Sequence, residues 1–336
     1  MKDHPLRYAC ANELHARPFP STEAPATAVY LAIKQSENAS SRDRDLDRAH
    51  LLALLDRYGA DHPAPEATHF YGQIGKYWLK WEQHTEFVTY TAFRAGVGRR
   101  AFDPREFDVF PEDWLADAPG ERLTSSIIRI DKGKKDPQIV KAVQDWFVPE
   151  SVAVSRVLDG SATIAGDFRI DPAGHLRFAV FVGADTGPRR VGSVVQRINE
   201  IETYKSMAML GLAKGRSLTP RLNELASNLI DLIGTLSDGP LEDDAALERL
   251  LSMSSELEQM QAQAAFRFNA TAAYEKIVNQ RIDVLREERF GGRQTFAEFM
   301  MRRFDPAMRT VESTEGRLIA ISKRANRASS LLRTKV

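Results

Sequence analysis

The spacing of apolar residues changes near Pro188, and this change constrains the fold more than any other feature. Before Pro188, apolar and polar side chains alternate, which is the pattern of half-buried β-strands. After it, apolar residues recur every three or four positions, which is the pattern of amphipathic helices. We therefore expect an α+β domain over residues 1–186 and a long-helix domain over residues 187–336. A chain of 336 residues is long enough for two compact domains.

One order of elements occurs twice in the first domain. Strand-like runs at 27–34 and 126–130 are each followed by a helical stretch, at 43–58 and 137–146. Three more strand-like runs follow each helix, at 69–74, 77–81 and 86–94, and at 152–158, 163–170 and 176–182. This recurrence predicts a duplicated unit that begins strand-helix-strand-strand, for which a ferredoxin-like arrangement is one candidate. Residues 95–123 are rich in Gly, Pro and Asp and are expected to form a loop.

Two elements of the first copy have a clear apolar face. Val29, Leu31 and Ile33 alternate with their neighbours and should lie on one side of a strand. The helical stretch carries an apolar stripe made of Leu46, Leu51, Leu54 and Leu55. These residues are predicted to belong to the core.

Apolar stripes also define the helices of the second domain. They comprise Val191, Val194, Ile198 and Ile201; Leu222, Leu225, Leu229, Leu232 and Leu236; Leu250, Met253, Leu257 and Met260; and Val311, Thr314, Leu318, Ile321, Ala325, Ala328 and Leu332. Thr295 and Glu298 predict a capping box at the start of a short helix. The last stripe has heptad spacing. Two arrangements stay open: an antiparallel bundle within one chain, or a coiled-coil stalk that joins chains.

Charge and cysteine content exclude several classes of protein. The 46 basic and 46 acidic side chains balance, which argues against broad nucleic-acid binding because that needs a basic field. Cys10 is the single cysteine, so neither an internal disulfide nor a multi-cysteine metal cluster can form. We expect Cys10 to be a small buried residue. The sequence has no signal-peptide core and no apolar run near the roughly 20 residues that span a bilayer.

No complete catalytic motif is present, but two short segments concentrate polar chemistry. The sequence lacks a phosphate-binding Gly-rich loop, a nucleophile elbow and a His-Glu-x-x-His pair. The first segment places Glu13, His15 and Arg17 within five residues, just before a turn that contains Pro18. The three side chains can form a site; the alternative is a helix end at which His15 and Arg17 satisfy backbone carbonyl groups.

The second segment contains Glu82, His84 and Glu86. If this segment is extended, the three side chains project to one face. Such a row can bind a divalent metal or position His84 as a general base. The alternative is a solvated strand face with cross-strand ion pairs.

The end of the chain is basic. After Glu315 there is no acidic residue, whereas the basic ones are Arg317, Lys323, Arg324, Arg327, Arg333 and Lys335. Positive charge suits a helix C-terminus. It also suits a segment that approaches an anionic membrane from the cytoplasmic side, or one that contacts RNA through this tail alone.

Several motifs resemble the bacterial family known as domain of unknown function 3422. They are His4–Arg7, Asn12–Phe19, Trp81–Phe87, Glu200–Lys205 and Leu331–Val336, in collinear order over the whole chain. Gln83 departs from the basic residue that the family pattern has there. The resemblance implies a membrane-anchored protein at the cytoplasmic face of the inner membrane, because family members continue beyond Val336 into transmembrane segments. The chain is then the soluble part of a longer protein or a member without the anchor.

The helical half is also similar to the mitochondrial "required for meiotic nuclear division" family, whose members place an α+β domain before helices and a membrane anchor. Taken together, the sequence favours a non-enzymatic interaction or scaffold module that binds a protein partner or associates with itself. No cofactor is predicted, and nucleic acid is not expected as a partner. The alternative is a metal- or phosphate-dependent enzyme or ligand sensor that uses His15, Arg17, Glu82, His84 and Glu86. In that case Arg17 holds an anion.

Overall fold

The computed structural model describes residues 2–13, 19–35, 42–237 and 243–333. The chain forms two compact units. The first, here called the sheet unit, comprises Met1–Thr203 and Gln280–Phe299. The second, here called the helical unit, comprises Tyr204–Asn279 and Met300–Val336.

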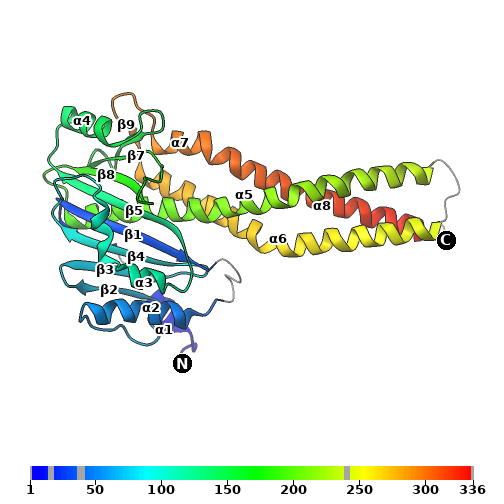
Figure 1. Cartoon of the computed structure of the whole chain (residues 1–336), viewed down its shortest axis with the longest axis horizontal. Coiled ribbons are helices and arrows are strands. Elements are labelled where there is room, and N and C mark those ends of the chain that lie inside the picture. The colour runs from blue at the N-terminus through cyan, green and yellow to red at the C-terminus, as the bar shows by residue number, and fades with distance from the viewer. Residues whose placement is uncertain (1, 14–18, 36–41, 238–242, 334–336) are drawn as a thin grey trace. The chain divides into compact units, whose positions relative to one another are not determined.

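The sheet unit contains one mixed sheet of nine strands (Figure 1). The strands are β1 Ala26–Lys34, β2 His69–Ile74, β3 Tyr77–Gln83, β4 Val88–Ala95, β5 Glu121–Lys132, β6 Ala153–Val157, β7 Ala162–Gly166, β8 Leu176–Val182 and β9 Glu288–Arg289. Their order across the sheet is β2-β3-β4-β1-β5-β8-β7-β6-β9. The predicted α+β class is confirmed.

Most of the helices lie where the 3.6-residue spacing of apolar residues predicts them. They are α1 Arg7–Glu13, α2 Arg44–Arg57, η2 Pro104–Val109, α3 Glu112–Ala116, α4 Asp136–Trp146, α5 Pro188–Ser237, α6 Asp243–Leu285, α7 Phe296–Arg303 and α8 Asp305–Arg333. The change from strands to helices comes at the start of α5. The boundary between the two compact units lies further along the chain, after Thr203, because the first turns of α5 belong to the sheet unit. The capping box at α7 is confirmed: Glu298 N donates to Thr295 Oγ1, and Thr295 N donates to Glu298 Oε2.

The predicted repeat is present in the order of elements but not in the strand directions. Both β1-α2-β2-β3-β4 and β5-α4-β6-β7-β8 occur, and β1 pairs with β5 at the centre of the sheet. However, β4 runs antiparallel to β1, whereas β8 runs parallel to β5. The ferredoxin-like expectation is wrong, because that unit has the order β-α-β-β-α-β, whereas each copy here has one helix followed by three strands.

The main core lies on one face of this sheet, beneath α2, α3 and α4. Val29, Leu31 and Ile33 are all buried there, as their alternation predicts. From α2, the residues Leu51, Leu54 and Leu55 are fully buried, but Leu46 is exposed and is not part of the core. Leu46 lies in the first turn of α2 but off its buried face, which Asp47 and His50 occupy at that end of the helix.

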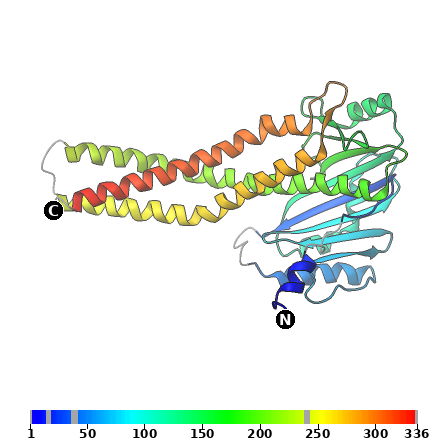
Figure 2. The same cartoon turned by 180° about the vertical axis from the view of Figure 1, so that it is seen from behind.

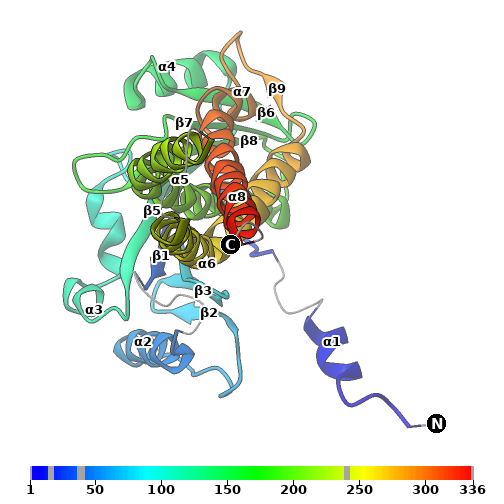
Figure 3. The ribbon, with the colours of Figure 1, turned by 90° about the vertical axis from the view of Figure 1, so that its right-hand side faces the viewer.

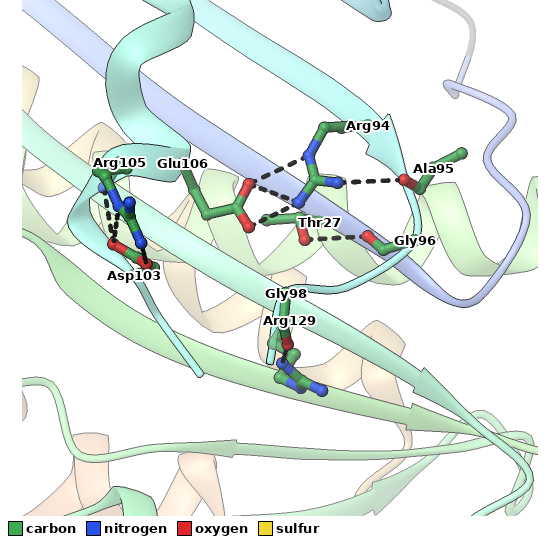
Figure 4. Close-up of polar contacts among 9 residues, drawn as sticks. All are labelled: Thr27, Arg94, Ala95, Gly96, Gly98, Asp103, Arg105, Glu106 and Arg129. Atoms are coloured by element: carbon green, nitrogen blue, oxygen red, sulfur yellow. Dashed lines mark hydrogen bonds and ion pairs between the residues drawn. The ribbon is translucent and has the colours of Figure 1, made fainter. Parts of the chain in front are cut away.

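The connection between β4 and β5 is more ordered than the loop predicted for residues 95–123. It holds η2, α3 and the first residues of β5. Asp103 caps η2 by accepting from Arg105 N, and Arg94 holds η2 through a two-pronged ion pair with Glu106 (Figure 4). Arg129 of β5 donates to Gly98 O at 2.8 Å. These contacts hold the segment between β4 and β5 in a defined structure. The sequence pattern did not predict this structure, because a helix cap and an ion pair produce no periodic spacing of apolar residues.

The helical unit is a bundle of α5, α6 and α8 (Figure 2, Figure 3). Its distal core includes Leu222 and Leu225 of α5, Leu257 of α6, and Leu318 and Leu332 of α8. The heptad stripe of α8 is therefore buried against helices of the same chain. Of the two arrangements left open by the sequence, the structure has the bundle within one chain.

Candidate functional site

The structure describes part of the predicted site residues. His15 and Arg17 lie outside the described residues. Cys10 is exposed rather than buried, because the described side chains of α1 are exposed to solvent.

The predicted face of Glu82, His84 and Glu86 does not exist as one strand face. β3 ends at Gln83, and His84 N donates to Phe87 O at 2.9 Å to close a turn before β4. Glu82 forms an ion pair with Lys80 at 3.1 Å, while Glu86 is buried. The turn carries no Gly or Pro, so no residue type in the sequence marks the end of the strand.

No group of three or more His, Cys, Asp and Glu within the described ranges could hold a metal ion. Metal binding and general-base catalysis by these residues stay predictions.

A buried ion pair fixes this turn to the start of α2. Arg42 and Asp47 lie 3.1 Å apart, and each side chain is 2% exposed. Arg42 also donates to His84 O at 2.6 Å, and Gln83 donates to Asp47 at 3.4 Å. Burial raises the pKa of Asp47 and lowers the pKa of Arg42, and the attraction between the two charges opposes both changes. Each charge is therefore stabilised mainly by the other, and Glu86 is a weaker second counter-charge for Arg42.

A second polar network joins the sheet to α5 and α6. Lys80, already paired with Glu82, donates to Gln196 Oε1 at 2.8 Å. Gln196 then donates to Glu200, and Glu200 forms an ion pair with Arg281 of α6. The two sequence segments that contain Glu82 and Glu200 are thus brought together, with Lys80 and Gln196 as links that the sequence did not single out.

Separate polar contacts form a layer between the sheet and the first turns of α5. The Tyr30 hydroxyl contacts the Thr203 hydroxyl, and Thr124 donates to Glu202 at 3.2 Å. All four side chains are buried. Buried polar groups of this kind are satisfied by specific partners, so the layer sets the position of α5 on the sheet. Its chemistry is that of a hydrogen-bonded packing interface.

Two buried histidines lie in the sheet unit. The ring nitrogens of His50 contact the Tyr90 hydroxyl at 3.1 Å and the Trp114 carbonyl at 2.9 Å. His175 contacts the Ser125 hydroxyl at 2.9 Å. Burial lowers the pKa of both imidazoles below the ordinary value of 6.5. Folding therefore favours the neutral form of both imidazoles.

We expect the sheet unit to lose stability as the pH falls below about 6.5. The unfolded chain binds protons on these histidines at a higher pH than the folded chain does, so acid favours unfolding. Each histidine contributes a slope of up to about 1.4 kcal/mol per pH unit. Urea midpoints measured by fluorescence between pH 7 and 5.5 test this, with His50→Gln as the variant and exposed His62→Gln as the control. An unchanged slope in His50→Gln would show that His50 does not contribute.

The surface of the helical unit is basic along the end of α8. Lys323, Arg324, Arg327 and Arg333 are exposed, and none forms an ion pair with any residue in the described part of the chain. Leu331 lies among them and is 62% exposed. Of the helices that the structure describes, none has the length and apolar character that a membrane span requires.

Comparison with known proteins identifies a family but no characterised relative. The chain matches the family described as "Protein of unknown function (DUF3422)" over residues 2–336. No curated protein and no solved structure matches the chain. Because the match covers essentially the whole sequence, the chain belongs to this DUF3422 family.

Proposed function

We propose that this chain is a non-enzymatic interaction module that acts at the cytoplasmic face of the inner membrane. The observation that carries the proposal is the exposed basic end of α8, where four exposed cationic side chains and the exposed Leu331 lie on the same stretch of helix. In this role the helical unit meets anionic lipid, and the sheet unit binds a protein partner or a second copy.

The physics of a charged lipid surface supports this choice. Each Lys or Arg near an anionic membrane contributes about 1 kcal/mol, and the attraction decays within a Debye length. Four such residues therefore contribute about 4 kcal/mol at low ionic strength. An exposed leucine among the basic residues adds apolar contact with the interface, which a purely electrostatic nucleic-acid surface does not need.

The polar segments of the sheet unit support a non-enzymatic role. Glu82 is paired with Lys80, and Glu200 is paired with Arg281. Both carboxylates serve contacts between elements of the fold, which is the ordinary use of such pairs.

We expect the chain to co-sediment with vesicles that contain phosphatidylglycerol. With vesicles of neutral phosphatidylcholine, the chain should remain in the supernatant. Replacing Lys323, Arg324, Arg327 and Arg333 together with glutamine should weaken binding about 10²–10³-fold at low salt, given about 1 kcal/mol for each charge. Binding of the unmodified chain should fall steeply as salt is added.

The matched control removes the same charge from the sheet unit. Its four substituted residues, all exposed and basic, are Arg99, Arg100, Lys132 and Lys134. Equal loss of binding in both variants would show that binding depends on the net charge of the chain and not on the basic end of α8. Binding to RNA with no binding to anionic vesicles would contradict the proposal.

A further inference from the structure

The two edges of the sheet are protected to very different degrees. β9 has two residues, Glu288 and Arg289, and both are charged and exposed. Short length and charge are the usual means by which a protein prevents its edge strands from pairing with another chain. β2 has six residues, His69–Ile74, and none of them is Lys, Arg, Asp, Glu or Pro. The sheet therefore has one guarded edge and one open edge (Figure 1).

The register of the β2–β3 ladder tells which backbone groups point outward. Gln83 N donates to Thr68 O at 2.8 Å, so this pair is hydrogen-bonded. Because hydrogen-bonded and non-bonded pairs alternate in an antiparallel ladder, Phe70, Gly72 and Ile74 bond to β3. The N–H and C=O groups of His69, Tyr71 and Gln73 then point away from β3. Among the residues that the structure describes, no hydrogen bond to these outward groups is found.

An exposed aromatic pair lies beside this open edge. Tyr71 of β2 stacks on Trp78 of β3 with ring centroids 5.4 Å apart, and the two residues are 40% and 47% exposed. Tyr71 also donates to Ser21 O, which holds its ring in place. Tyr and Trp are the residues most often found at the centres of protein interfaces.

We propose that β2 pairs with β2 of a second copy of this chain, antiparallel and about a two-fold axis at Tyr71. In this register Tyr71 faces Tyr71 of the second copy and exchanges both backbone hydrogen bonds with it. His69 then faces Gln73, and Phe70 faces Gly72. The ring of Phe70 already covers the space beside Gly72 in the single chain, with its Cζ only 2.5 Å from where a Cβ on Gly72 would be.

Self-complementarity favours a second copy over another partner. A two-fold axis places each residue against a residue of the same strand, and β2 contains no charge that could oppose a like charge. The register also aligns two stacked aromatic pairs, one from each copy, on the same side of the joined sheets. Pairing of one strand buries less than the ~1,600 Å² of a standard interface, so the dimer should be weak, with dissociation in the micromolar range.

Sedimentation equilibrium over a range of concentrations tests the proposal. The unmodified chain should pass from monomer to dimer, and Tyr71→Lys should stay monomeric because it opposes two like charges at the axis. Tyr71→Glu should also stay monomeric. An equimolar mixture of the two variants should dimerise again, since only a two-fold register at residue 71 brings Lys against Glu. Tyr71→Phe should dimerise like the unmodified chain.

Backbone evidence comes from two further measurements. Gln73→Pro removes an outward N–H without touching the β2–β3 ladder, and should abolish the dimer while leaving the melting temperature nearly unchanged. Amide exchange at His69, Tyr71 and Gln73 should slow as protein concentration rises, whereas exchange at Phe70 and Gly72 should stay constant.

A chain that remains monomeric up to about 200 µM, well above the expected dissociation constant, overturns the proposal. So does a dimer that Tyr71→Lys leaves intact, or a mixture of Lys and Glu variants that stays monomeric. Capture of an extended peptide by a monomeric chain would assign the edge to a different partner and would also overturn it. The proposal does not depend on membrane binding, because vesicle sedimentation of Tyr71→Lys should be unchanged.

Discussion

Asp47→Ala is expected to destabilise the sheet unit by about 3–5 kcal/mol. The change leaves the Arg42 guanidinium buried without its ion-pair partner, 3.1 Å from where the carboxylate was, with buried Glu86 as a weaker remaining counter-charge. Water cannot reach Arg42 to replace the lost partner, because its side chain is only 2% exposed. The cost is therefore that of a buried charge without its ion-pair partner and exceeds that of a surface ion pair.

The double variant Arg42→Met with Asp47→Leu separates this cause from simple loss of contacts. Both charges are removed, so the free energy of unfolding should return to within about 1–2 kcal/mol of the unmodified chain. Tryptophan fluorescence is a selective probe, because all four tryptophans (Trp78, Trp81, Trp114 and Trp146) belong to the sheet unit. A urea titration in which the double variant is less stable than Asp47→Ala would refute the ion-pair explanation.

Gly211→Ala is expected to destabilise the helical unit by about 1–3 kcal/mol. In most helices this substitution stabilises by about 0.5–1 kcal/mol, because alanine is the better helix former. At Gly211, however, a Cβ would lie 2.1 Å from Thr271 Oγ1 and 2.9 Å from Thr271 Cβ. Thr271 is buried on α6 and has no room to move away, so α5 and α6 must separate.

Gly234→Ala is the matched control, because it lies on the same helix with no atom within 4 Å of the added Cβ. We expect it to stabilise the helical unit. Thr271→Ala should partly rescue Gly211→Ala, since it removes Oγ1 but leaves Cβ in place. Circular dichroism at the helical minimum follows this unit, which contains no tryptophan. Equal effects at Gly211 and Gly234 would show that helix propensity outweighs packing at this contact.

The candidate site was only partly predictable. The sequence singled out the segments around Glu82 and Glu200, and the structure connects them through Lys80 and Gln196. It did not single out Arg42 and Asp47, because nothing in the spacing of two charged residues near a helix start shows that both will be buried. It also placed Glu82, His84 and Glu86 on one strand face, because no turn residue marks the end of β3.

The sequence by itself determined the class of the main strands and helices, but not of η2, α3 or β9. Burial of one face imposes a period of two on a strand and of 3.6 on a helix, and this local signal located Val29, Leu31 and Ile33 in the core. The capping box of Thr295 and Glu298 was equally local, since both partners lie within one helical turn.

Tertiary structure alone decided which elements meet. The single nine-stranded sheet, the burial of the α8 stripe within its own chain and the open edge at β2 each depend on pairing between residues far apart in sequence. A periodic pattern shows that a face is buried but not what covers it. Many partners satisfy the same hydrophobic face, and the choice among them is made by shape, strand direction and specific polar contacts.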